Sequence, residues 1–125
     1  MRQYLLAIVL NTIILSSCYA NEAGIKHVKG LYVNYEGAEY ERTFIPCNTD
    51  GAWWVDGGVA FNELTSLYRS STLSKYGELY VELEGKFIPI DKAKYPDSHY
   101  SGDFQIVKLV GSSTDSKIID TCRGK

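Results

Sequence analysis

A short apolar segment at the N-terminus limits the part of this 125-residue chain that can form a folded domain. The first twenty residues, MRQYLLAIVLNTIILSSCYA, start with a basic residue, continue with a mainly apolar run over 4–15 and end in small residues. That run is too short to span a bilayer, where about 20 residues are needed. The layout is typical of an export signal. The alternative, a buried N-terminal helix, would be apolar on its whole circumference.

Two cleavage sites are compatible with the end of this signal. The sequence LSSC, ending at Cys18, resembles a bacterial lipobox, in which the cysteine thiol receives a diacylglycerol. The next residues also fit the small-x-small site of ordinary signal peptidase, with a cut after Ala20. We favour lipidation of Cys18, which predicts a lipid anchor in the bacterial cell envelope, on the outer membrane and facing the periplasm. The other cut predicts a secreted or soluble periplasmic protein.

The mature chain then has a short tether over 21–26 and a single domain over 27–125. Both routes remove the Cys18 thiol, by acylation or by cleavage, and leave two cysteines available for pairing, Cys47 and Cys122. An exported domain of this size most often pairs two cysteines in a disulfide. The alternative is a metal-binding or catalytic thiol pair, but the chain has no CxxC motif and no nearby histidine at ligand spacing. We therefore predict a Cys47–Cys122 disulfide worth about 4 kcal/mol in the chain-entropy model.

Composition and alternation favour β-structure. Ten tyrosines suit half-buried strands, and 11 glycines punctuate the chain. Strands are predicted over 27–34, 39–45, 78–84 and 104–110. Trp53 to Val55 reads as a short strand or a corner. Gly85 is expected to end its strand, which leaves 86–90 as a bend or a next strand, and 118–119 fits a further short strand.

One segment changes to a helical period. Apolar side chains recur three and four residues apart at Phe61, Leu64, Leu67 and Tyr68. This spacing predicts a single amphipathic helix over 59–70. Residues 91–102 form the longest irregular stretch of the chain.

Short strands with one helix between the third and fourth predict a mainly β fold, an OB-fold-like five-stranded barrel. The alternative is an α+β fold, an open antiparallel sheet with one packed helix. The imperfect third strand keeps both interpretations open.

One stretch of the chain resembles a known family. It reads FIPC…GAWWVDG…ELTSLYRS…YGELYVELEGKF, is followed by DFQIVKLV and a late cysteine, and covers about 30–110. The positions that carry the resemblance are Phe44, Cys47, Trp53, Trp54, Tyr68, Tyr80, Val81 and Gly85. They are similar to small bacterial envelope lipoproteins related to the C-terminal OB-fold domain of the NlpE family, which is linked to copper homeostasis and envelope stress. The resemblance implies the fold, and the family's CxxC motif is missing here.

Catalytic residue sets are not evident in the sequence. The only histidines, His27 and His99, are far apart, and each lies among polar residues. Glu82 and Glu84 share one strand face about 7 Å apart, which fits the water-facing side of an amphipathic strand. We predict no enzymatic activity, no metal and no cofactor. The formal net charge of −2, without a basic run, also argues against nucleic acid as a partner.

Aromatic side chains are the candidate binding residues. Trp53 and Trp54 are neighbours, so in an extended segment they point to opposite faces, one packed in the core and the other exposed. Tyr95, His99 and Tyr100 cluster in the long irregular stretch. Barrels of this type bind ligands on one sheet face and its surrounding loops. We therefore predict binding at the tryptophan corner or at this loop.

These observations predict an exported, lipid-anchored and non-enzymatic protein, acting as a binding or envelope-stress interaction module. The partner would be an envelope protein or a glycan. The alternative is a secreted, disulfide-bonded inhibitor of a host or rival enzyme, because such inhibitors are small and rich in β-structure.

Overall fold

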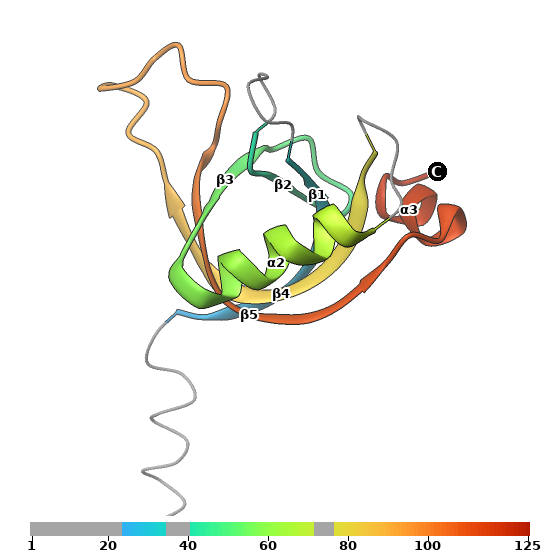
Figure 1. Ribbon diagram of the computed structural model, residues 1–125. Helices are drawn as coiled ribbons and strands as arrows, with labels where there is room; N and C mark the ends of the chain where they lie inside the picture. The colour runs from blue at the N-terminus through green and yellow to red at the C-terminus, as the bar shows by residue number, and fades with distance from the viewer. Residues whose placement is uncertain (1–23, 35–40, 72–76) are drawn as a thin grey trace, which may run out of the picture.

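The computed structural model describes residues 24–34, 41–71 and 77–125. In these ranges the chain forms five strands and two helices (Figure 1). The elements in order are β1 (Lys26–Val33), β2 (Thr43–Pro46), β3 (Trp53–Asp56), α2 (Gly58–Ser70), β4 (Leu79–Pro89), β5 (Gly102–Ser113) and α3 (Ser116–Cys122).

The five strands form a closed barrel in the order β1-β2-β3-β5-β4, with β4 returning to pair with β1. Only β3 and β5 run parallel, and the other four pairs are antiparallel. The helix α2 follows the third strand. The prediction of an OB-fold-like barrel is therefore confirmed, and the alternative of an open sheet is wrong.

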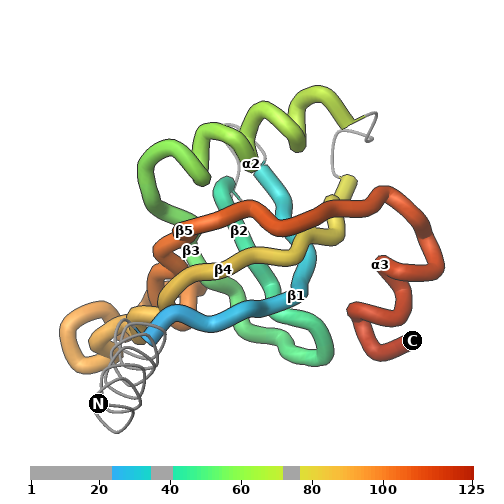
Figure 2. The backbone as a smooth tube through the Cα atoms, turned by 90° about the horizontal axis from the view of Figure 1, so that it is seen from below, coloured from blue at the N-terminus to red at the C-terminus, as the bar shows by residue number. Residues whose placement is uncertain are grey.

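The barrel core is aromatic and aliphatic. Phe44 and Phe104, on opposite strands, are fully buried with ring centroids 5.1 Å apart. The helix α2 contributes Ala60 and Leu64 to the same cluster, which is the buried face that the apolar spacing predicted. Tyr32 on β1 meets Tyr68 on α2 edge to face at 5.5 Å. Figure 2 shows α2 running across the barrel on the side of β5, so the helix closes the apolar interior.

Gly85 does not end its strand, contrary to our expectation. β4 continues through it to Pro89, and 86–89 belong to the same strand. A Cβ atom at Gly85 would collide with the ring of Phe104 and the carbonyl oxygen of Gln105. Register shifts against β5 lie on both sides of Glu84. The glycine therefore allows close packing inside an irregular strand. In the sequence, a glycine with this role looks the same as one that ends a strand.

Two further expectations differ from the structure, and one open alternative is decided. Residues 41–42 form a turn, so β2 begins at Thr43; residues 39–40 lie outside the described ranges. Of the two alternatives for Trp53 to Val55, the strand is correct, because Trp53 to Asp56 pairs with both β2 and β5. Residues 118–119 lie in the helix α3 rather than in a strand. The prediction of a single helix was therefore wrong. The Asp115 carboxylate accepts hydrogen bonds from the backbone N–H groups of Lys117 and Ile118, which caps this helix.

Neither helix in the described part of the chain is long and apolar enough to span a membrane.

Candidate functional site

The connection between β4 and β5, residues 90–101, projects from the barrel at the upper left of Figure 1. Hydrogen bonds order it internally. The Asp91 carboxylate accepts a hydrogen bond from the backbone N–H of Ala93, at 3.0 Å. The Asp91 carbonyl oxygen accepts another from the backbone N–H of Tyr95, at 2.8 Å. The Lys92 ammonium donates to the carbonyl oxygens of Ser98 and Tyr100, each at 3.3 Å. The predicted irregular stretch is therefore a braced loop, which we call the β4–β5 loop.

Tyr100 attaches this loop to the barrel. Its hydroxyl donates to the carbonyl oxygen of Glu41 at 3.0 Å and lies 3.1 Å from the hydroxyl of the buried Thr43. Its ring meets Trp54 edge to face, with centroids 5.6 Å apart. Tyr100 is half-buried. Of the predicted binding residues, Tyr100 therefore has a structural role, which is to hold the loop against the barrel.

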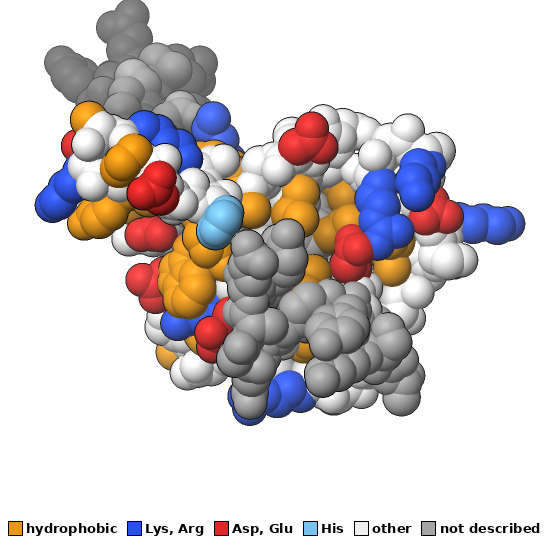
Figure 3. Space-filling view, turned by 90° about the horizontal axis from the view of Figure 1, so that it is seen from above, with side chains coloured by type: hydrophobic (Ala, Val, Ile, Leu, Met, Phe, Trp, Pro, Cys, Tyr) orange, Lys and Arg blue, Asp and Glu red, His pale blue; other side chains and the backbone are white. Residues whose placement is uncertain are grey.

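The outer part of the loop is exposed. The side chain of Tyr95 is 51% exposed, and the Lys94 ammonium lies 5.5 Å from the centroid of its ring. His99 is also exposed. Figure 3 views this end of the molecule, where hydrophobic side chains lie among basic and acidic ones. Tyr95 and His99 are therefore the predicted residues that a partner can reach.

The two tryptophans point to different surroundings, as their adjacency implies. Trp53 packs against the core and meets Phe87 at 4.7 Å. Trp54 lies on the other side of β3, against Tyr100 and 5.1 Å from the Arg42 guanidinium carbon. Both are half-buried. The expectation that one would be exposed was wrong, because the β4–β5 loop and Arg42 cover Trp54.

Arg42 is a residue of this site that the sequence analysis missed. Its guanidinium carbon lies 3.8 Å from the centroid of Phe61 and its Nη2 lies 3.7 Å from the Asp56 carboxylate. Its backbone has φ of 52°, and its carbonyl accepts from the N–H of Val55 at 2.8 Å. The residue thus joins the β2–β3 hairpin to α2. No local pattern in the sequence marks this role.

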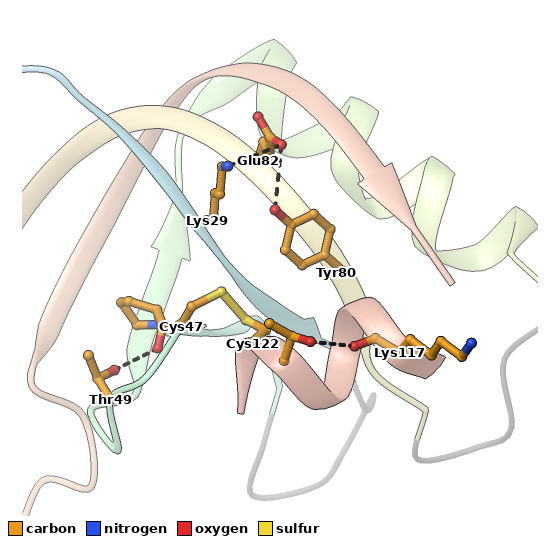
Figure 4. Close-up of a disulfide and its surroundings, with 9 residues drawn as sticks. Lys29, Cys47, Thr49, Tyr80, Glu82, Lys117 and Cys122 are labelled. Carbon is orange, nitrogen blue, oxygen red and sulfur yellow. Dashed lines mark hydrogen bonds and ion pairs between the residues drawn. A yellow bond between two sulfur atoms is a disulfide. The ribbon is translucent and has the colours of Figure 1, made fainter. Parts of the chain in front are cut away.

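The predicted disulfide is present. Cys47, directly after β2, is bonded to Cys122 at the end of α3, across a sequence separation of 75 residues (Figure 4). The backbone N–H of Asn48 donates to the Cys122 carbonyl at 2.8 Å. Arg123 forms an ion pair with Glu78 beside it. These contacts attach α3 to the barrel.

His27, Glu82 and Glu84 lie together on the water-facing side of β1 and β4. The Nε2 atom of His27 lies 3.1 Å from the Glu82 carboxylate, and its Nδ1 atom lies 3.9 Å from that of Glu84. The register places His27 opposite Glu84 and Lys29 opposite Glu82. Such cross-strand pairs contribute about 0.2–1 kcal/mol each. Across 24–34, 41–71 and 77–125, no group of three or more His, Cys, Asp or Glu side chains is placed to hold a metal ion.

Comparisons of the chain with family models, with curated proteins and with solved structures found no match. The proposed lipidation residue, Cys18, lies outside the described residues.

Proposed function

We propose that the chain is an exported, lipid-anchored protein of the bacterial cell envelope that binds another envelope protein through its β4–β5 loop. The proposal treats the barrel as a non-enzymatic scaffold. Export and the anchor rest on the signal-like first twenty residues and on Cys18 within LSSC.

The observation that carries this proposal is the contrast between the loop's order and its exposure. Its backbone is braced by Asp91 and Lys92, and Tyr100 ties it to the barrel. The Tyr95 side chain, in the outer part of the loop, is nevertheless 51% exposed. Preordering a loop lowers the entropy lost on binding. An ordered loop with an exposed aromatic side chain therefore fits recognition of a partner.

Shape favours a protein partner over a small ligand. The β4–β5 loop projects from the barrel (Figure 1). Small ligands bind in concave sites that bury most of their surface. Three hollows on the described surface are lined by residues outside the loop. A projecting loop with Tyr95 beside Lys94 instead suits insertion into a partner's surface, where tyrosine is a frequent energetic centre.

The test is a comparison of three forms of the mature domain, residues 21–125, as bait for envelope proteins. We expect the wild type to retain a specific protein, and Tyr95→Ala to lose at least tenfold of its affinity for it. Val107→Ala is the matched control, because Val107 is similarly exposed, at 55%, on β5. Equal retention by all three forms would show that the loop does not bind the partner. A partner that is a secreted enzyme and is inhibited would favour the inhibitor alternative.

The anchor needs its own test. Radiolabelled palmitate should enter the full-length chain and be absent from Cys18→Ser. A mature N-terminus at Asn21, with no label in either form, would show the ordinary signal-peptidase cut to be correct.

A further inference from the structure

A hollow of about 350 Å³ lies beside the disulfide, between the outer side of the barrel and α3. This is within the range of about 300–1,000 Å³ that small-ligand sites occupy, at its lower end. In Figure 1, α3 lies on the opposite side of the molecule from the β4–β5 loop. The hollow is therefore separate from the surface proposed above to bind a protein.

The inner surface of the hollow is apolar. It includes the Cys47–Cys122 disulfide and the ring of Tyr80, and Figure 4 shows both around one space. Ile118 on α3 also lines it and is 41% exposed. The half-buried Tyr80 ring and the exposed Ile118 side chain in a concave surface favour contact with an apolar group.

Tyr80 presents its ring rather than its hydroxyl to a ligand. The hydroxyl donates to the Glu82 carboxylate at 3.5 Å, along the outer side of β4 (Figure 4). Burial and the neighbouring Glu82 carboxylate raise the pKa of Tyr80 above its ordinary value. The side chain therefore stays neutral at physiological pH, and its ring remains available for packing.

The polar side chains that line the hollow are cationic or neutral. Lys29 and Lys117 both line it, Asn48 adds an amide, and no Asp or Glu is among the lining residues. Lys29 Nζ lies 4.0 Å from the nearest Glu82 oxygen, too far for a strong hydrogen bond, and the Lys29 side chain is 58% exposed. Each ammonium group carries up to three donors. An anion at the rim would therefore gain charge-assisted hydrogen bonds.

The walls of the hollow are held in place by bonds already described. The disulfide and the Asn48 N–H to Cys122 carbonyl bond fix the C-terminal end of α3. The Asp115 cap orders its first turn, from which Lys117 and Ile118 project. The two lysines thus come from β1 and α3, which the fold brings to one space from positions 88 residues apart in the sequence.

We propose that this hollow binds an organic carboxylate attached to an apolar or ring-shaped body about the size of one amino acid. The apolar body packs on Tyr80, Ile118 and the disulfide. The carboxylate lies at the rim, where it pairs with the ammonium group of Lys29 or of Lys117. Two sources share this chemistry, the C-terminal residue of a peptide and a carboxylated sugar.

The test is a titration of ¹⁵N-labelled mature chain, residues 21–125, followed by amide chemical shifts. N-acetyl-L-phenylalanine is the peptide-type probe and N-acetylmuramic acid is the sugar-type probe. Their neutral counterparts are N-acetyl-L-phenylalanine amide and N-acetylglucosamine. We expect saturable shifts at Asn48, Tyr80 and Ile118 with one or both acids, and at least fivefold weaker binding of the matching neutral compound. Comparing the two acids identifies the source.

Substitutions locate the charge. One of the two variants Lys29→Gln and Lys117→Gln should weaken acid binding about threefold, as expected for the loss of one exposed ion pair. Lys94→Gln in the β4–β5 loop is the matched control and should leave binding unchanged. The amide spectrum of each variant reports its folding in the same experiment.

Three results would overturn the proposal: no saturable shift with either acid, equal binding of the neutral compounds, or shifts that map away from α3. None of these depends on whether the β4–β5 loop binds a protein.

Discussion

The hydroxyl oxygens of Tyr100 and Thr43 lie 3.1 Å apart, although 57 residues separate them in the sequence. Both also lie within hydrogen-bond distance of the Glu41 carbonyl oxygen, at 3.0 Å for Tyr100 and 3.2 Å for Thr43. Thr43 is fully buried. This small network joins the end of the β4–β5 loop to the start of β2, so the order of the loop depends on the barrel.

Tyr100→Phe should therefore lower the free energy of unfolding by about 1–2 kcal/mol, because it removes the hydroxyl that meets Glu41 and Thr43. Urea unfolding measures this change. Tyr95→Phe is the control, since Tyr95 is exposed in the same loop, and it should have no effect. Combining Tyr100→Phe with Thr43→Val should cost less than the two single changes together. Strict additivity would show that the two hydroxyls do not interact.

The two tryptophans should differ in their contribution to stability. Trp53→Ala should cost about 3 kcal/mol, because Trp53 packs on the core and on Phe87. Trp54→Ala should cost about 1–2 kcal/mol, because it loses the Tyr100 ring and the Arg42 guanidinium on the outer side of β3. Urea unfolding followed by circular dichroism gives both values. A larger cost at Trp54 would contradict this assignment of the two faces.

Removing the disulfide should act on the whole domain and most strongly on α3. The bond closes a loop of 75 residues, so Cys47→Ala with Cys122→Ala should lower the free energy of unfolding by about 4 kcal/mol. Amide hydrogen exchange should accelerate first in α3. Alkylation of the unreduced wild type in denaturant should find no free thiol. Two modified cysteines in that sample would mean that the bond does not form.

Stability should fall in strong alkali because of Tyr32. The side chain is fully buried, and burial raises its pKa to about 12 from an ordinary value of 10.0. Below about pH 10 both the folded and the unfolded chain keep this proton. Between about pH 10 and 12 the unfolded chain loses it more readily, so about 3 kcal/mol of stability is lost over that interval.

Tyr32→Phe tests this assignment. The buried Tyr32 hydroxyl has the Thr65 hydroxyl as a neighbour but no well-formed hydrogen bond among the described residues, so the variant should be about as stable as the wild type at pH 7. Its stability should also decline less between pH 10 and 12. Tyr68 retains part of the decline, because burial raises its pKa as well. Identical pH profiles for the variant and the wild type would remove Tyr32 as the cause.

Local patterns in the sequence were sufficient for much of the barrel. The alternation at Leu79, Val81 and Leu83 marks a strand with one buried face, and all three side chains are buried. The helical spacing of Leu64 with its neighbours places α2 correctly. In both cases a single segment buries one face against the core, and the spacing of apolar residues in that segment indicates the buried face.

Features that depend on distant neighbours were not accessible in this way. Gly85 resembles a strand end until the ring of Phe104 is placed against it. The position of Arg42 between Trp54 and Phe61 needs three elements to meet. The helix α3 was missed although Asp115 is a suitable cap, because its seven residues are too few to show a period.

For the candidate site, the β4–β5 loop was predictable as an irregular segment, but the different positions of Tyr95 and Tyr100 within it were not. Tyr100 is held by Glu41 and Thr43, more than fifty residues earlier in the sequence.

The parallel pairing of β3 with β5, like the pairing of β1 with β4, joins distant parts of the chain, so we expect closure of the barrel late in folding. Trp53 meets Gly102 across an intervening helix and strand, so the chain must fix about fifty residues before this pair can form. Pairings of such long range slow folding, because the loop entropy is lost before the contacts form. A nascent chain that ends before β5 would hold four strands and a helix whose apolar faces have no closed barrel to enclose them. The addition of β5 is thus the step at which the barrel encloses its apolar core.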